Sequence, residues 1–328
     1  QDISGWNVGS VTSMSSMFAS ASVFNQDISG WNVGAVTTMA SMFQFSSDFN
    51  RDISSWNVGS VTSMAYMFRS ASAFNNDING WNVNSVTNMQ NMFESASVFN
   101  QQLCWDLTGK TTTDIFTGTN GASTIVCPPT SQPTGQPTCV PTGQPTCIPT
   151  GQPTGQPYAF ADKAELVIAI DAWVADETVA TTTYGDISHW DVSAVTDMSY
   201  LFKDLDDRQL KAGAAADDDY YYEDTFNSDI SAWNVASVTN MTSMFHNARA
   251  FNQDISGWNV GAVITMESMF READVFNQNI GTWNVGSVLD MTDMFYKAKL
   301  FNQDINAWDV SNVLSMEGLF RNECPFNQ

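Results

Sequence analysis

The chain has 328 residues, enough for two domains of ordinary size, and its 12 Lys and Arg face 35 Asp and Glu, for a net charge of −23. Such an acidic surface repels nucleic acid and anionic lipid, so we expect neither as a partner. No apolar run reaches the roughly 18 residues of a membrane span, so we expect no membrane insertion. The chain opens in mid-repeat at Gln1, without a Met or a visible signal peptide, and we interpret it as a mature product or a fragment of a longer chain.

A 25-residue period runs through residues 1–127, which we predict to be a first block of stacked coils. The period is marked by Trp6, Trp31, Trp56 and Trp81. A fixed period of this size is typical of repeat proteins, in which stacked supersecondary units bury one continuous core. Trp105 comes 24 residues after Trp81 and the motif ends there, as expected of a terminal, capping repeat.

Each repeat is predicted to hold one short strand and one short helix. In residues 26–50, the segment from Ile28 to Val33 is β-branched and aromatic, which predicts a strand that ends at Gly34. From Val36 the apolar spacing becomes helical for about two turns. The sequence therefore predicts an α/β solenoid whose stacked Trp, Met and Phe columns fill the core.

Three polar columns also run through the repeats. The first is Asn25, Asn50, Asn75, Asn100, Asn227, Asn252, Asn277, Asn302 and Asn327; the second is Asn7, Asn32, Asn57, Asn82, Asn234, Asn259 and Asn284; the third is Asp2, Asp27, Asp52, Asp77, Asp229, Asp254 and Asp304. We expect the first column to satisfy backbone groups of adjacent turns. Carboxylates stacked about 5 Å apart repel, so the acidic column needs backbone hydrogen bonds or shared calcium ions. Asn279 interrupts it, which counts against an obligatory metal ladder.

The five cysteines lack the C-x-x-C spacing of zinc and redox sites. Cys104 and Cys127 bracket the end of the first block, which predicts a disulfide in its cap. This pattern favours an oxidising, extracellular setting. The odd count leaves at least one thiol unpaired or bonded to another chain.

Residues 128–157 are predicted to be a linker. They hold nine of the ten prolines in a Pro-Thr-Gly-Gln pattern and too few apolar side chains for a core, so we expect a semi-extended spacer. Two interpretations stay open: a plain linker, or a strap in which Cys139 and Cys147, together with Cys324 near the end of the chain, crosslink neighbouring chains. The threonines that invite O-glycosylation are Thr134, Thr138, Thr142, Thr146, Thr150 and Thr154.

Residues 158–328 form the predicted second block. It opens with an amphipathic helix, Ala161 to Val174, that we expect to cover the first coil. Its coils are phased by Trp190, Trp233, Trp258, Trp283 and Trp308. An acidic, tyrosine-rich insertion occupies 203–225. We interpret it as a solvated loop or, alternatively, as a contact for a basic partner, a neighbouring protomer or calcium, whose ligands would be Asp217, Asp218 and Asp219.

The repeat resembles that of BspA-like leucine-rich-repeat surface proteins. The resemblance rests on Trp-x-Val-x-x-Val-Thr-x-Met-x-x-Met-Phe followed by Phe-Asn-Gln, as in residues 6–26, and it covers about 270 residues in both blocks. The segment from Lys163 to Trp190 is similar to the family's amino-terminal cap, and the Leu-Cys-Trp end of the first block to its carboxy-terminal cap. The resemblance implies a leucine-rich-repeat-like solenoid displayed on the cell surface for attachment or assembly, and it carries over no catalytic residue.

The order of the caps leads to a prediction about assembly. The first block has only a closing cap and the second only an opening cap, so we expect two exposed coil ends, cut in the same phase. Such ends pair with complementary ends. The second block of one copy would then continue into the first block of the next and build an open filament.

Chemistry-bearing motifs are missing from the sequence. Its two histidines, His189 and His246, lie in different coils, and neither a P-loop, a dinucleotide fingerprint nor a zinc-protease motif occurs. We therefore expect no enzyme, no cofactor and no catalytic residue. One N-glycosylation sequon begins at Asn240. Two functions stay open: an extracellular structural or adhesive protein that pairs head-to-tail with its own copies, or a module that binds a glycan or surface protein.

Overall fold

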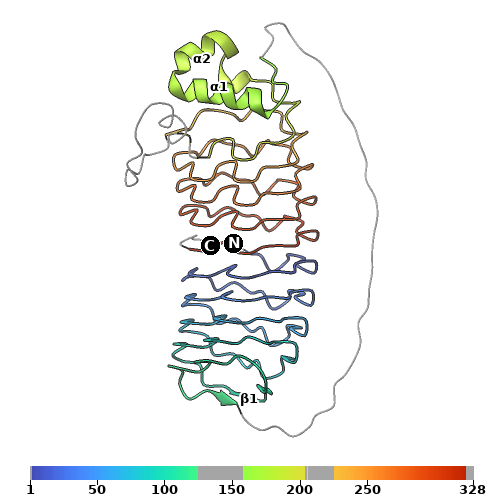
Figure 1. Cartoon of the computed structure of the whole chain (residues 1–328), viewed down its shortest axis with the longest axis vertical. Helices are drawn as coiled ribbons and strands as arrows, with labels where there is room; N and C mark the ends of the chain where they lie inside the picture. Colours follow the sequence, from blue (N-terminus) through green and yellow to red (C-terminus); the bar gives the residue numbers. More distant parts are fainter. Residues whose placement is uncertain (1, 125–157, 204, 206–224, 323–328) are drawn as a thin grey trace.

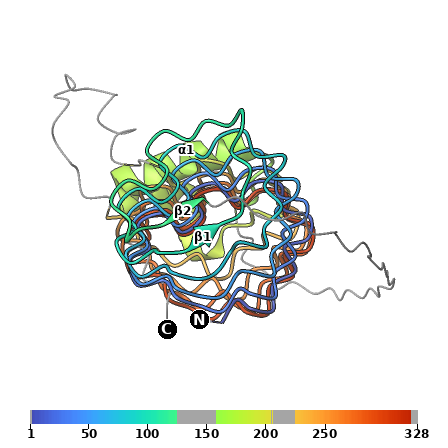
Figure 2. The ribbon, with the colours of Figure 1, turned by 90° about the horizontal axis from the view of Figure 1, so that it is seen from below.

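The computed structural model describes residues 2–124, 158–203, 205 and 225–322. In these residues lie β1 (Gln102–Leu103), β2 (Ser123–Thr124), α1 (Lys163–Ala175), α2 (Glu177–Tyr184) and a 3-10 helix (Ile187–His189). The two strands pair in parallel. The remaining described residues form coils stacked one upon another, with α1 and α2 at one end of the stack and β1 at the other (Figure 1). Viewed along the stack, the coils superimpose in one outline (Figure 2).

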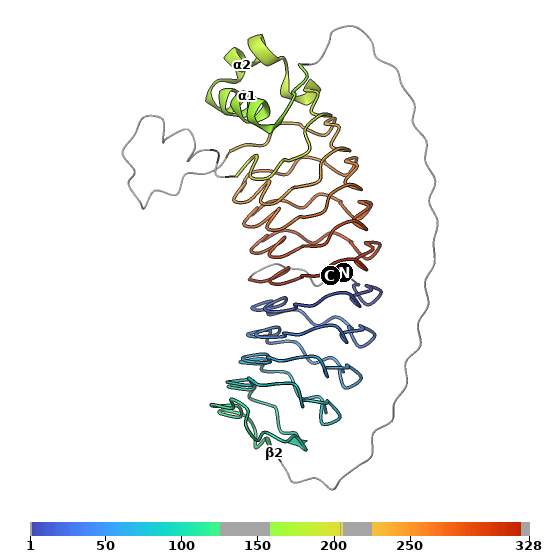
Figure 3. The same cartoon turned by 45° about the vertical axis from the view of Figure 1, so that its right-hand side comes forward.

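The coils do not follow one another in space as they do in sequence. Parallel bridges join equivalent residues of adjacent coils, and they run in the order Asp197, Asn240, Thr265, Asp290, Ser315, Ser13, Thr38, Ser63, Asn88 and Thr111. The second block thus comes first in the stack and continues directly into the first block. The first coil of the first block, 2–25, and the last described coil of the second block, 301–322, consequently lie next to each other in the middle of the stack (Figures 1 and 3).

The structure corrects the predicted strand and helix of each repeat. Within residues 26–50 it has neither a named strand nor a helix, and the single bridge residue is Thr38 rather than a residue of 28–33. Ser41 and Phe45 have φ of 57° and 60°, outside the right-handed helical region. The amides of Ser41, Phe43 and Phe45 donate to carbonyls of the next coil at 2.8, 2.9 and 2.8 Å. A helix would need these donors for its own i−4 carbonyls, so the apolar spacing of 3, 3 and 1 produces tight turns instead.

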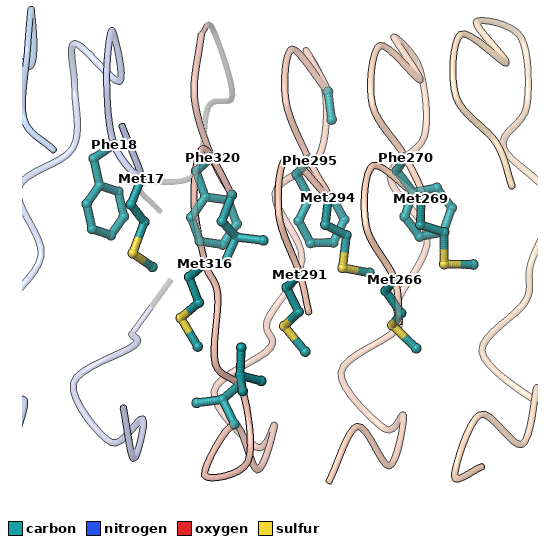
Figure 4. Packing of buried hydrophobic residues seen from close by; sticks show 14 of the residues in the cluster. Met17, Phe18, Met266, Met269, Phe270, Met291, Met294, Phe295, Met316 and Phe320 are labelled. Atoms are coloured by element: carbon teal, nitrogen blue, oxygen red, sulfur yellow. The ribbon is translucent and has the colours of Figure 1, made fainter. Parts of the chain in front are cut away.

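The interior consists of columns of aromatic rings and methionines. Phe43 stacks on Phe49 within its coil, with ring centroids 3.8 Å apart, and on Phe68 of the next coil at 5.6 Å. The phenylalanine and methionine columns are fully buried and continue across both blocks (Figure 4). Offset stacking of this kind adds to the stabilisation from buried area, and flexible thioethers fill the gaps between rings.

The repeated tryptophan also joins adjacent coils through a hydrogen bond. In eight coils the indole Nε1 donates to the carbonyl of an isoleucine in the preceding coil of the stack, as Trp258 does to Ile230 at 3.2 Å. The same bond is made by Trp6, Trp31, Trp56, Trp81, Trp233, Trp283 and Trp308. Trp105, which comes one residue early, has a buried Nε1 without a partner among the described residues. Trp233 keeps the bond, at 2.9 Å to the Ile187 carbonyl, although it comes 43 residues after Trp190, so the bond depends on how the coils stack and not on a 25-residue step.

Helix α1 closes one end of the stack. Asp162 caps its first turn, with Oδ1 accepting from the Glu165 amide at 3.0 Å. The predicted apolar stripe is buried, and its Trp173 ring packs edge-on against Trp190 with centroids 5.9 Å apart. The helix therefore covers the aromatic column of the first coil.

The indole bond predicts the effect of substituting Trp258. Trp258→Phe leaves a buried carbonyl without its donor and should lower the free energy of unfolding by about 1–3 kcal/mol. Trp258→Ala also opens a cavity and should lower it by about 3–5 kcal/mol. Urea denaturation followed by circular dichroism measures both. The control is Leu289→Thr, an exposed site where the first block carries threonine, which should change stability by less than about 0.5 kcal/mol. Equal effects of the three substitutions would contradict the role of the indole bond.

Candidate functional site

The acidic column is bonded to the backbone. In each coil the aspartate Oδ1 accepts from the amide two residues later, as Asp27 does from Ser29 at 3.0 Å. The same turn forms at Asp2, Asp52, Asp77, Asp229, Asp254 and Asp304. Asn279, which interrupts the column, accepts from Gly281 at 3.1 Å through its amide oxygen. The expected backbone bonding is confirmed, and asparagine can replace aspartate because the bond needs only the oxygen.

These hydrogen bonds also set the ionisation of the column. Bonds from the side chain and backbone of Ser29 hold the pKa of Asp27 below the ordinary aspartate value of 3.8, and the charge of Asp2 opposes them with a weaker effect. The pKa is lowered for the same reason at Asp2, Asp52, Asp229 and Asp254. No group of three or more His, Cys, Asp and Glu in the described part of the chain is arranged to hold a metal ion.

The repeated Phe-Asn-Gln forms a ladder between coils. The Asn252 side-chain oxygen accepts from the backbone amide of Asn277 at 2.9 Å, and Gln278 Nε2 donates to the Asn252 carbonyl at 2.7 Å. The asparagine bond recurs at Asn50, Asn75, Asn100 and Asn302, as expected for this column. The glutamine bond recurs at Gln101, Gln253 and Gln303. The role of the glutamine was missed in the sequence, although its fixed place after the asparagine was the signal.

The second asparagine column stays within its own coil. Asn32 Oδ1 accepts from the Gly34 amide at 3.2 Å, and the equivalent bonds occur at Asn7, Asn57, Asn82, Asn234, Asn259 and Asn284. All three polar columns thus hold the backbone of the coils, which leaves the remaining surface positions as candidates for function.

Cations and aromatic rings gather on the surface near the turn segments. The clearest cluster surrounds Tyr296, whose ring centroid lies 4.1 Å from Arg271 Cζ, 5.2 Å from Lys297 Nζ and 5.8 Å from Arg321 Cζ. Arg271 pairs with Asp293 at 2.6 Å and Lys297 with Glu272 at 3.2 Å. Burial raises the pKa of Asp293, and Arg271 and Arg321 act in the opposite direction.

Two further clusters have the same composition. Arg69 lies 5.8 Å from the ring centroids of both Phe45 and Tyr66. Lys163 and Lys203 lie 5.9 and 5.5 Å from the ring centroid of Tyr200. Phe45 and Tyr200 are about half exposed, at 46% and 51%. As at Tyr296, a carboxylate pairs with a cation in each cluster, Glu94 with Arg69 at 2.8 Å and Asp197 with Lys163 at 3.3 Å.

The two coils that were expected to be exposed pack against each other within one chain. Met316, Gly318, Phe320 and Asn322 donate backbone bonds to Ser13, Ser15, Met17 and Ala19, and Thr12 donates to Leu314. The Phe320 ring lies between the second block and Trp6 and Phe18 of the first block, with centroid distances of 6.3 and 6.1 Å (Figure 4). We call this interface, between 301–322 and 2–25, the junction. It corrects the expectation of exposed ends, because each block supplies the coil face that the other lacks.

The other predicted sites are placed as follows. Asn240, the sequon asparagine, is a partly buried bridge residue, and its Oδ1 accepts from the Thr242 amide at 3.0 Å. Cys104 follows β1, and its partner in the predicted disulfide, Cys127, lies outside the described residues. Also outside them lie Cys139, Cys147, Cys324, Asp217, Asp218, Asp219 and the linker threonines Thr134, Thr138, Thr142, Thr146, Thr150 and Thr154. These sites stay predictions.

The lowered pKa of the acidic column predicts a loss of stability in acid. Because the folded pKa lies below 3.8, the folded chain binds fewer protons than the unfolded chain in this range. The stabilisation is present above pH 3.8 and should be lost as the pH falls through the folded pKa. The urea midpoint measured at intervals below pH 5 tests this.

Asp27→Asn provides the matched comparison for that measurement. It keeps the acceptor oxygen and removes the titration, so its midpoint should fall less steeply with acid than that of the parent. Leu289→Thr, an exposed substitution without an ionisable group, should leave the slope unchanged. If the urea midpoint of Asp27→Asn fell with acid as steeply as that of the parent, the titration of Asp27 would not be the cause of the lost stability.

Sequence comparisons agree with the repeat organisation. The family described as Mycoplasma protein of unknown function, DUF285, matches residues 1–117, 174–212 and 215–328, and the PT disordered repeat matches residues 128–159. No curated protein and no solved structure matches the chain. The first match spans both blocks and well over half of the chain, and the chain therefore belongs to the DUF285 family.

Proposed function

We propose that this chain is an extracellular structural or adhesive surface protein, built as a leucine-rich-repeat-like solenoid, whose copies assemble head-to-tail. The single observation that carries the proposal is the junction. It consists of the same backbone ladder, indole bond and ring stacking that join adjacent coils within the two blocks. A second block can therefore dock on any first block that presents the same face.

The geometry of such docking favours an extended assembly. The face of coil 301–322 differs from the face of coil 2–25, so the contact is heterologous. Heterologous contacts repeat without limit unless a rotation closes them into a ring. The caps at the two outer ends of the stack, α1 on one side and the β1–β2 pair on the other, direct assembly to the junction faces alone.

Other features support a non-catalytic role outside the cell. The polar columns are engaged with the backbone, and polar groups so engaged hold the coil geometry. Membership in a family of repeat proteins and the predicted cap disulfide favour the cell surface. Within the described residues, no helix combines the length and apolarity that crossing a membrane requires.

Assembly is tested by concentrating the purified chain. We expect light scattering to rise with protein concentration and electron microscopy to reveal unbranched fibres one coil-stack wide. Phe320→Arg places a charge in the buried ring column at the junction and should abolish the fibres, whereas Leu300→Arg, at an exposed site of the same block, should not. A chain that stays monomeric at all attainable concentrations would refute head-to-tail assembly.

A second candidate function is favoured by the cation and aromatic clusters. The rings of Tyr296, Tyr200 and Phe45, each with cations beside it, offer stacking surfaces and charge for a glycan or protein ligand. This function needs only a single chain, whereas the first needs assembly.

Binding to the clusters is tested with an array of neutral and acidic glycans. We expect saturable binding by monomeric protein, strongest for carboxylated or sulfated glycans, and a loss of at least about tenfold in affinity, or about 1.4 kcal/mol, for Tyr296→Ala. Leu300→Ala, an exposed substitution away from the rings, should bind like the parent. Uniform weak binding that Tyr296→Ala leaves unchanged would rule out the cluster as the site.

A further inference from the structure

Several contacts across the junction are slightly longer than the equivalent contacts of the other coils. The Met316 amide lies 3.2 Å from the Ser13 carbonyl, against 2.7–3.1 Å for the equivalent bonds of the other coils. The next two bonds, from Gly318 and Phe320, measure 3.0 and 3.1 Å, against 2.7–2.9 and 2.8–3.0 Å elsewhere. The bonds on either side of these three, from Thr12 to Leu314 at 2.8 Å and from Asn322 to Ala19 at 2.9 Å, have ordinary lengths.

The side chains at the junction agree with the backbone. Trp6 Nε1 lies 3.3 Å from the Ile305 carbonyl, whereas the same bond measures 2.9–3.2 Å in the other coils. The Phe18 and Phe320 centroids are 6.1 Å apart, against 5.2–5.8 Å for the equivalent rings. The Trp6 and Phe320 centroids, 6.3 Å apart, lie within the 5.8–6.5 Å of the equivalent pairs, so the junction is packed like the other interfaces of the stack.

Chain connectivity distinguishes the junction from the other interfaces. Within a block, the chain runs from one coil directly into the next, so a coil that separates from its neighbour stays tethered to it. Coils 301–322 and 2–25 are joined only through the whole remainder of the chain. Separation at the junction therefore breaks the packing between one pair of coils without unravelling either block, and local opening occurs where the least packing has to be broken.

We propose that the stack opens at the junction and that the two freed faces pair with the matching faces of a second copy. The same interface then forms within the chain in the closed monomer and between chains in the fibre. This inference rests on the proposed head-to-tail assembly and adds its mechanism. The partner is a second copy because the two faces are complementary to each other, Trp6 and Phe18 on one side and Ile305 and Phe320 on the other.

Protein concentration controls the exchange. The interactions that break when the junction opens are the same as those that form when a second copy docks, so their energies cancel. The balance depends on protein concentration relative to the effective concentration of the two faces within one chain. β2, the last described element before the linker, and α1, the first helix after it, lie at opposite ends of the closed stack (Figure 3). The open form releases the linker from that fixed separation, which favours opening.

A pair of cysteines across the junction tests the exchange. Ser13 and Ser315 are parallel bridge partners, and residues so paired lie about 4.8 Å apart, within the range of disulfide Cα separations. The variant Ser13→Cys with Ser315→Cys is made in a background of Cys139→Ser, Cys147→Ser and Cys324→Ser. The matched control, Thr38→Cys with Ser63→Cys, crosslinks two coils inside the first block and leaves the junction free. Circular dichroism verifies that both variants fold.

The first measurement locks the closed form. After oxidation at low concentration, we expect the junction variant to stay monomeric at concentrations where its reduced form assembles. The oxidised control should assemble like the parent. Failure of the junction cysteines to link in the dilute, folded monomer would overturn the inference, as would assembly of the locked monomer.

The second measurement identifies the partner. Labelled and unlabelled chains of the reduced junction variant are mixed, assembled and then oxidised. We expect linked peptide pairs that carry one labelled and one unlabelled member. Assemblies whose links are all within single chains would refute the exchange and leave head-to-tail assembly to another surface. Absence of assembly in parent and control would refute both proposals.

Discussion

The whole stack depends on the way alternate backbone amides of each turn segment are donated to the next coil. The backbone amides that donate to the next coil are those of Met39, Ser41, Phe43 and Phe45. Amides between them close β-turns within the coil, as from Met42 to the Met39 carbonyl. No donor in this segment is left for a helix. Because every coil uses the same donors, every coil face is equivalent to the next. This equivalence allows a second block to precede a first block in space and to continue into it.

The side-chain columns reinforce that ladder from three sides. Indole nitrogens bond to carbonyls in the core, asparagine and glutamine amides bond between coils at one edge, and aspartates fix the turn before each tryptophan. Because each of these side chains bonds to the backbone, its position in the repeat is fixed, whereas a different residue type with the same donor or acceptor can replace it. Asn279, which stands in the aspartate column and accepts the same bond, illustrates this tolerance.

The period, the core columns and the capping helix could be predicted from sequence because they depend on spacing and on apolar character. The secondary structure within a repeat could not. Met39, Met42 and Phe43 have the spacing of a helical stripe, and the left-handed conformation at Ser41 and Phe45 leaves no signal in residue type. A glycine at these positions would indicate a positive φ, whereas a serine or a phenylalanine does not. The cation clusters were also missed, because Arg271, Tyr296 and Arg321 meet only when coils 25 residues apart are stacked.

The same limit applies to the junction. Sequence alone identified two complementary coil ends but could not decide whether they would meet within a chain or between chains, because the register is identical in both cases. Two free-energy costs decide between pairing within a chain and pairing between chains. The first is the entropy lost by holding the flanks of the linker at opposite ends of one stack, and the second is the entropy lost by bringing two chains together. Neither cost involves a contact at the interface. Substitutions at the junction faces should therefore weaken closed and assembled forms alike, whereas a change in linker length alone would shift the balance between them.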